Sequence, residues 1–317
     1  MNKKDLSSDI RRLAEAKRAV ILAHYYTEGA VQDVADFVGD SLALAQQAAK
    51  TEADIIVMCG VHFMAETCKI LCPAKKVLIP DPEATCSLAE SCPGDAFAEF
   101  VRQHPDHKVI SYVNTSAATK AVTDIVVTSS NARQIVESFP KDQALIFGPD
   151  RNLGSYINSI TGREMLLWDG ACHVHERFSP AKILEAKAAH PQALVLAHPE
   201  CKAPVLKLAD VVGSTARLLN YAVQSECREF IVVTESGILH EMQRQAPEKL
   251  FIPVAPEAPE TPGCSCNECN YMRLVTLEKL YRCLKDEAPE VVLPEGIRKK
   301  AERPIRAMLE LSAKLGL

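Results

Sequence analysis

The sequence predicts an α/β protein made of three similar α/β/α domains with short parallel sheets, related by pseudo-threefold symmetry. Two observations lead to this fold class. Short apolar runs rich in β-branched side chains alternate with helical stretches, which is typical of parallel β-α-β units. The alternation also recurs along the 317 residues with a period of about 86 residues, and such a repeat determines the architecture.

Two landmarks define the period independently of each other. One is the polar end of an apolar run, and the other is a hydroxyl residue that opens a predicted helix. The polar strand ends are His24, Tyr112 and His198, spaced 88 and 86 residues apart. The hydroxyl residues are Ser41, Ser129 and Ser214, spaced 88 and 85 residues apart. Because both landmarks agree, we expect three copies of one unit that close around a pseudo-threefold axis.

Each unit contains three strand-like runs in the same order. The first runs are Val20–Tyr26, Val109–Asn114 and Leu194–Glu200. The second runs are Ile55–Cys59, Ala144–Phe147 and Phe230–Thr234. The third runs are Lys75–Pro80, Met165–Asp169 and Leu250–Ala255. Amphipathic helices are predicted between them, for example at Leu42–Lys50 and Ala216–Gln224, and closing helices at Leu274–Leu284 and Ile297–Leu315.

These elements divide the chain into four parts. We expect α/β/α repeats at residues 1–104, 105–188 and 189–285, the last of which includes a cysteine loop. Residues 286–317 are expected to form a helical tail that packs back on the body. The proline-rich segment Ala246–Gly263 is incompatible with a helix interior or a central strand, so we expect an exposed loop there.

The composition excludes several classes of protein. An apolar content of 47% is that of a globular protein with a substantial core. A net charge of −5 without a run of Lys or Arg argues against a nucleic-acid surface. We find neither a signal-peptide pattern nor the ~20 apolar residues of a membrane span. We therefore expect a cytoplasmic protein, whose 12 cysteines are more often thiols or metal ligands than disulfides.

Three cysteine positions follow the third strand-like runs of the repeats. Cys86 and Cys172 follow the first two of these runs, and the third run leads to Cys264, Cys266 and Cys269. One thiolate from each repeat would form a metal site with one open position. A single C-x-x-C is weak support for structural zinc, so an iron–sulfur centre is favoured. The other cysteines are expected to be small buried residues: Cys59, Cys68, Cys72, Cys92, Cys201, Cys227 and Cys283.

Polar residues gather where the first strands end. In open parallel sheets the carboxyl ends of the strands line the ligand crevice. The residues at these ends are His24, Tyr26, Tyr112, Asn114, His198 and Glu200. At predicted helix starts, where backbone N–H groups favour anions, lie Ser41, Ser129, Ser214 and Thr215. His24 and His198 are equivalent and suggest a carboxylate-binding pair, although each residue alone also fits a structural histidine or a plain helix cap.

Several residues keep two interpretations. Glu200 is either a general base with a raised pKa or an acid at a helix start. His173 and His175 are either a metal-binding pair or part of a polar loop beside the cluster. Arg151 is either an anion contact or a turn residue. The motifs of phosphate-binding loops, dinucleotide-binding folds and serine hydrolases are absent, so those functions lack support.

Six stretches together resemble the quinolinate synthase (NadA) family, which acts in de novo NAD synthesis. No single stretch would suffice, but the resemblance extends over nearly the whole chain. The stretches are Ala23–Ala45, Tyr112–Ala132, Phe147–Ile157, Trp168–Phe178, Ala197–Leu218 and Cys266–Tyr281.

The resemblance implies a reaction and a cofactor. The reaction is the condensation of iminoaspartate with dihydroxyacetone phosphate to quinolinate, phosphate and water. The cofactor is an oxygen-sensitive [4Fe-4S] cluster with three cysteine ligands, whose open iron acts as a Lewis acid. The implied ligands are Cys86, Cys172 and Cys269. Some members have C-x-x-C-x-x-C where this chain has C-x-C-x-x-C, so Cys266 is the second choice.

The resemblance also implies roles for the strand-end residues. The substrate carboxylates would be held by His24, Ser41, His198, Ser214 and Thr215. Asn114 and Ser129 would bind the phosphate end of the triose. Glu200 would be the general base, and Tyr26 and Tyr112 would position or protonate leaving oxygens. A functional link to an L-aspartate oxidase is implied. The rivals are a non-catalytic iron–sulfur redox or sensor protein with a fourth protein ligand, and a hydro-lyase of the aconitase kind.

Overall fold

The computed structural model describes residues 3–256 and 267–317, with side chains described from residue 5 onward. The cysteines in this part of the chain are free thiols. The predicted alternatives Cys264 and Cys266, and part of the predicted proline-rich loop, lie outside the described residues.

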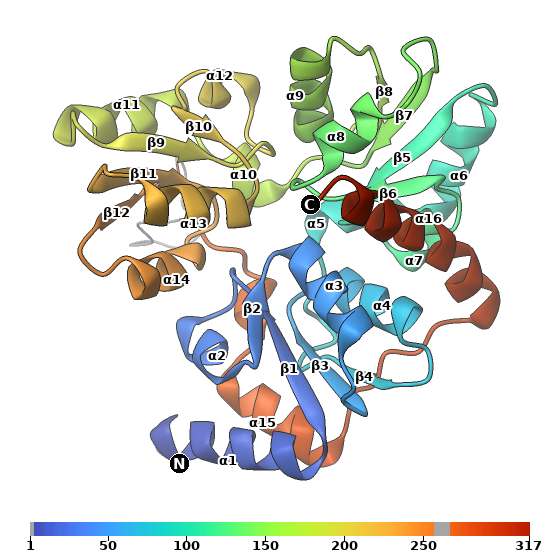
Figure 1. The fold of residues 1–317 in the computed structure, drawn as a ribbon, viewed down its shortest axis with the longest axis vertical. Coiled ribbons are helices and arrows are strands. Elements are labelled where there is room, and N and C mark those ends of the chain that lie inside the picture. The colour runs from blue at the N-terminus through green and yellow to red at the C-terminus, as the bar shows by residue number, and fades with distance from the viewer. Residues whose placement is uncertain (1–2, 257–266) are drawn as a thin grey trace.

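Three lobes surround a common centre (Figure 1), and each lobe contains a four-stranded parallel sheet. The first sheet has the order β2-β1-β3-β4, with the strands Phe37–Gly39, Ala19–His24, Ile55–Cys59 and Lys76–Leu78. The second has the order β6-β5-β7-β8, with the strands Ile125–Val127, Lys108–Tyr112, Leu145–Gly148 and Leu166–Leu167. The third has the order β10-β9-β11-β12, with the strands Val211–Val212, Leu194–Ala197, Glu229–Val233 and Leu250–Pro253. The identical order confirms the predicted fold class.

Each sheet has one strand more than the sequence analysis predicted. The additional strands β2, β6 and β10 lie at the sheet edge next to the first strand of each lobe. An aspartate ahead of each edge strand accepts a hydrogen bond from a backbone N–H of the first strand. The pairs are Asp36 Oδ2 with Ile21 N (2.8 Å), Asp124 Oδ2 with Val109 N (2.9 Å) and Asp210 Oδ2 with Val195 N (2.7 Å). The same contact therefore anchors the edge strand in all three lobes.

Helices cover both faces of the sheets. In the first lobe they are α1 (Lys3–Ala16), α2 (Gly29–Val34), α3 (Ser41–Lys50), α4 (His62–Leu71) and α5 (Ser87–Glu90). In the second they are α6 (Gly94–Arg102), α7 (Ala117–Lys120), α8 (Ala132–Glu137) and α9 (Arg151–Thr161), and the short helix α10 (His173–Glu176) lies beside the third lobe (Figure 1). In the third they are α11 (Pro180–Ala189), α12 (Ala203–Leu206), α13 (Thr215–Gln224) and α14 (Ile238–Gln245). Because both faces are covered, central strands such as β3 and β7 are buried at every position.

After the third sheet the chain returns to the first lobe. A 3₁₀ turn, η1 (Met272–Leu274), leads into α15 (Leu277–Asp286), and α15 packs against α1. Leu280 and Cys283 of α15 share one buried cluster with Leu6 and Ile10 of α1. The predicted boundary at residue 285 assigns α15 to the third repeat, although the helix packs against α1 of the first lobe. The limits of the domains stay a prediction.

The last helix, α16 (Glu295–Lys314), crosses the second lobe (Figure 1). Ile305 and Met308 are buried there beside β6 and α7. Near the end of the helix, Asn131 Nδ2 donates a hydrogen bond to Ser312 Oγ over 2.9 Å. Both predicted closing helices are thus confirmed, within a few residues. None of the described helices combines the length and apolar character that crossing a bilayer requires.

Candidate active site

A cavity of about 70 Å³ lies where the carboxyl ends of the three sheets face one another. Twelve of the thirteen residues to which the resemblance gives a role or a ligand position line it. They are His24, Tyr26, Ser41, Cys86, Tyr112, Asn114, Ser129, Cys172, His198, Glu200, Thr215 and Cys269. The structure therefore brings these side chains together, and their individual roles remain predictions.

Ser214 is the predicted site residue that does not line this cavity. It is the N-cap of α13, and its hydroxyl accepts a hydrogen bond from Arg217 N over 3.3 Å. The next residue, Thr215, begins the helix and reaches the cavity. Ser214 thus fits the plain capping interpretation, since an N-cap side chain satisfies one of the free N–H groups of the first turn.

Ser129 is not at a helix start, contrary to the prediction. The helix α8 begins at Ala132, and its N-cap is Asn131. Asn131 Oδ1 accepts a hydrogen bond from Thr128 N over 2.7 Å, so the asparagine forms the turn that separates Ser129 from the helix. Ser41, in contrast, is the first residue of α3, and Asp40 caps that helix.

The three thiols lie at the starts of short helical turns. Cys86 precedes α5, Cys172 precedes α10, and Cys269 precedes η1. Burial raises the pKa of Cys86 to about 12 and that of Cys269 to about 11, and it raises the pKa of Cys172 well above its usual value. The thiols also raise one another's pKa, because a charge on one sulfur disfavours a charge on its neighbours. All three cysteines line the same cavity.

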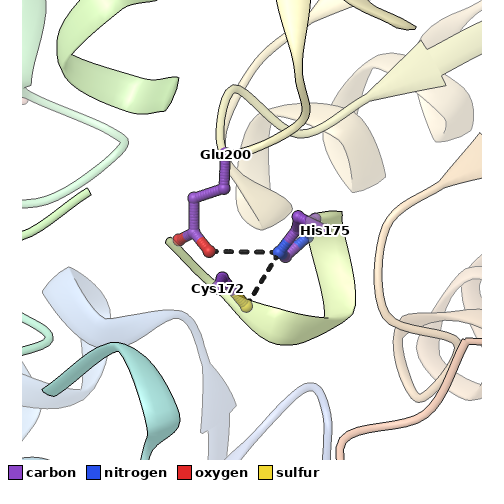
Figure 2. Close-up of side chains that lie close together, drawn as sticks. All are labelled: Cys172, His175 and Glu200. Atoms are coloured by element: carbon purple, nitrogen blue, oxygen red, sulfur yellow. Dashed lines mark hydrogen bonds and ion pairs between the residues drawn. The ribbon is translucent and has the colours of Figure 1, made fainter. Parts of the chain in front are cut away.

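His175 links one of these thiols to a buried carboxylate. Figure 2 shows His175 between Cys172 and Glu200. Its Nδ1 lies 3.3 Å from Cys172 Sγ and 3.0 Å from Glu200 Oε2. Potential ligand atoms of the three residues lie within 4.8 Å of one another, so the group could hold a metal ion. His173 faces Ser87 instead, with 2.7 Å between Nδ1 and Oγ, so the two histidines have separate partners.

Glu200 is buried, and polar side chains surround its carboxylate. The Tyr112 hydroxyl donates to Oε1 over 2.6 Å, and His198 Nδ1 lies 3.8 Å from the same oxygen. Burial by itself raises the pKa of the carboxyl group, but His175, His198 and the Tyr112 hydroxyl together bring it well below its usual range. The predicted raised pKa is therefore wrong, because the carboxylate has donors on both oxygens.

The two equivalent histidines are both buried. Burial lowers the pKa of His24 to about 4 and that of His198 to about 3, against the opposing effect of the Glu200 charge. His198 Nε2 lies 3.3 Å from Ser129 Oγ. Nearby, Asn114 Oδ1 is buried and has no hydrogen-bond partner within the described residues. The cavity thus offers buried imidazoles and an unused amide oxygen.

A series of hydroxyl contacts connects the lobes around the cavity. Tyr26 Oη lies 2.9 Å from Thr215 Oγ1 and 2.8 Å from Thr234 Oγ1. Thr234 Oγ1 in turn lies 3.0 Å from His175 Nε2. This series joins the first lobe to the third and reaches the His175–Glu200 pair, so a proton donor or acceptor is available at each position along it.

Sequence reasoning missed Thr234 and Glu235. Both follow β11, the second strand of the third repeat, and Glu235 lines the cavity while being 1% exposed. Burial raises the pKa of Glu235 to about 7, although Arg273 and two backbone N–H groups oppose this. The rule that strand ends line the ligand crevice would have found both residues had it been applied to the second strands as well as the first.

Comparison with known proteins agrees with this arrangement. The profile of the "Quinolinate synthetase A protein" family matches residues 8–310. The chain belongs to this family. It is 59% identical to a quinolinate synthase of Thermosynechococcus vestitus over 308 residues, which cover 97% of this chain and 96% of that relative. It is 58% identical to one of a Synechococcus species (98% and 96% covered) and 56% identical to one of Chloroherpeton thalassium (97% and 95%).

Proposed function

We propose that the protein is a quinolinate synthase of NAD biosynthesis. It condenses iminoaspartate with dihydroxyacetone phosphate and releases quinolinate, phosphate and two water molecules. The observation that carries this proposal is the cavity at the centre of the three lobes. It is lined by three thiols, Cys86, Cys172 and Cys269, and by buried acid–base groups, and the chain belongs to this family. In this proposal the reaction takes place in the cytoplasm, and an enzyme such as an L-aspartate oxidase supplies the iminoaspartate.

The cavity fits a [4Fe-4S] cluster held by Cys86, Cys172 and Cys269. Thiolates are the ligands that such clusters use, and no fourth cysteine lines the cavity among the described residues. When bound, the cluster would supply a Lewis-acidic iron that no protein thiolate occupies. The raised pKa values of the thiols agree with a site whose sulfurs lose their protons only when metal binds.

The anionic groups of the substrates have partners of suitable chemistry. His24, Ser41, His198 and Thr215 would hold the two carboxylates of iminoaspartate. Ser41 and Thr215 begin the ten-residue helices α3 and α13, whose first N–H groups favour negative charge. The phosphate end of the triose is assigned to Asn114, whose side-chain NH₂ group would donate to a phosphate oxygen, and to Ser129, whose Oγ lies 3.3 Å from His198 Nε2.

Glu200 would move protons, with two tyrosines beside the reacting atoms. Its Oε1 accepts the Tyr112 hydroxyl hydrogen bond and its Oε2 lies 3.0 Å from His175 Nδ1, so the carboxylate is within proton-transfer distance of both groups. Tyr112 donates to it over 2.6 Å and would return a proton to a leaving oxygen. Burial keeps the pKa of both Tyr26 and Tyr112 well above the usual value, which makes them donors and not charged groups.

The test is to count iron and sulfide after anaerobic purification of the wild type and of Cys86→Ala, Cys172→Ala and Cys269→Ala. We expect about four irons in the wild type and loss of both iron and quinolinate formation in each variant, because a cluster with only two thiolates is poorly held. The matched control is Cys227→Ala, since this thiol is partly exposed but lies outside the cavity.

Each alternative result has a distinct meaning. Cluster retention in Cys269→Ala would move the third ligand to Cys266 or Cys264. A full cluster without quinolinate formation by the wild type would contradict the proposed reaction and favour the hydro-lyase or redox rival. The same samples, mixed with citrate or quinolinate, distinguish these two rivals by the change in the cluster's spectrum.

A further inference from the structure

One buried carboxylate that lines the cavity has no role in the proposed reaction. Glu235 lies just beyond β11, and both of its oxygens accept hydrogen bonds. Oε2 accepts from Gly237 N over 2.6 Å. Oε1 accepts from Cys269 N over 3.1 Å and from Arg273 Nη2 over 3.3 Å. A carboxylate at 1% exposure is costly unless such donors compensate it, so its position needs a reason.

The donors around Glu235 hold one particular segment. Arg273 N donates to Cys269 O over 3.1 Å, so Cys269 lies in a turn closed by its own backbone. Ser236 N donates to Asn267 O over 3.0 Å. The turn that contains Cys269 is therefore attached to the end of β11 at two places, through the Glu235 side chain and through the Ser236 backbone.

Cys269 is attached to its sheet differently from the other two cysteines. Cys86 and Cys172 follow soon after β4 and β8, and the adjacent Ser87 and His173 join their two segments over 2.7 Å. Cys269 instead lies far along the chain from β12, which ends at Pro253. It is attached to the third sheet at the end of β11, through the Glu235 side chain and the Ser236 backbone.

We propose that Glu235 is a positioning residue whose carboxylate fixes the backbone of Cys269 and thereby the place of the third sulfur in the cavity. The proposal rests on the proposed function, in which Cys269 is a cluster ligand. A charge-assisted hydrogen bond to a backbone N–H suits this task. An amide at the same place would keep one acceptor oxygen and turn an NH₂ group toward a backbone N–H, so Glu235→Gln loses a bond and gains a repulsion.

The first test uses the apoprotein and does not depend on the cluster. Cys86, Cys172 and Cys269 are alkylated with N-ethylmaleimide under reducing, anaerobic conditions, and the rate at each site is followed by peptide mass spectrometry. In Glu235→Gln we expect the rate at Cys269 to rise about tenfold, since a loosened turn opens more often, while the other two rates stay within about twofold. Glu235→Asp, which keeps the charge but shortens its reach, should give an intermediate rate.

The second test uses the reconstituted holoprotein. After loading with ferrous iron and sulfide, the loss of iron to a chelator should be about tenfold faster in Glu235→Gln than in the wild type, as for other residues that orient metal ligands. The matched control is Glu241→Gln. Glu241 is a 3% exposed carboxylate of the same lobe that bonds Arg244 and Gln245 and lies outside the cavity.

The outcomes separate this proposal from the proposed function. An unchanged rate at Cys269 in Glu235→Gln, or an equal rise at all three cysteines, would overturn the positioning role. Equal effects of Glu235→Gln and Glu241→Gln would also overturn it, since any buried carboxylate would then behave alike. A wild type that binds no iron would defeat the proposed function, whereas the alkylation result would still decide whether Glu235 holds Cys269.

Discussion

Glu200→Gln should reduce quinolinate formation by roughly 10²–10⁴-fold while leaving the iron content unchanged, because the variant lacks the proposed general base. Glutamine has nearly the same shape and keeps an oxygen that can accept the hydrogen bond from Tyr112, now 2.6 Å long. Packing around this buried position should therefore persist. The measurement is the initial rate of quinolinate formation, taken together with iron and sulfide content in the same sample.

The control for this variant is Glu176→Gln. Glu176 accepts hydrogen bonds from Arg151 and Asn152, and Asn152 Nδ2 also donates to Glu200 O, but Glu176 does not line the cavity. We expect its turnover to stay within about twofold of the wild type, as for most partly exposed ion pairs. Near-normal turnover of Glu200→Gln with an intact cluster would remove Glu200 from the proton-transfer steps.

Gly237→Ala should have the second largest effect, on both activity and stability. A Cβ at this position would lie 2.7 Å from Tyr26 Cα and 2.8 Å from Tyr25 O, so it would collide with the backbone of the first lobe. We expect a loss of about 1–3 kcal/mol in the free energy of unfolding, as for overpacked cores. Because Tyr26 borders the cavity, a shift of about 1 Å should also lower kcat/KM by about 10²-fold.

Chemical denaturation and steady-state kinetics measure the two effects of this change. Gly296→Ala is the matched control, since a Cβ there meets nothing within 4 Å at the start of α16. That variant should be stabilised by about 0.5–1 kcal/mol, because alanine is the better helix former. Wild-type activity in Gly237→Ala would mean that the contact between the first and third lobes does not position Tyr26.

Much of the fold follows from the periodic part of the sequence. A buried strand such as Ile55–Cys59 and a helix such as α3 repeat the same apolar pattern, so their types could be predicted. The edge strands could not, because β10 contains only Val211 and Val212, too few residues for any period. Their pairing depends on Asp210 and its equivalents, whose side chains act across the sheet.

The site was predictable where function coincides with strand ends. His24 and Glu200 could be placed in the cavity on that basis. The direction of the Glu200 pKa shift could not be predicted from the sequence, since it depends on how closely His175 and Tyr112 approach Glu200 in space. Glu235 carried no pattern at all, because its partner Cys269 is distant in the sequence and the two meet only in the folded chain.

The arrangement of the three thiols has a consequence for how the protein folds and how it is degraded. With Cys86, Cys172 and Cys269 as ligands, an incomplete or partly unfolded chain would present too few sulfurs to keep iron, so metal retention reports the integrity of the whole molecule. The bound cluster would in return crosslink segments distant in the sequence and stabilise the native state by mass action. Loss of the cluster to oxygen would then remove both the crosslink between these segments and the Lewis-acidic iron. Oxidised molecules should therefore be less stable and be degraded first.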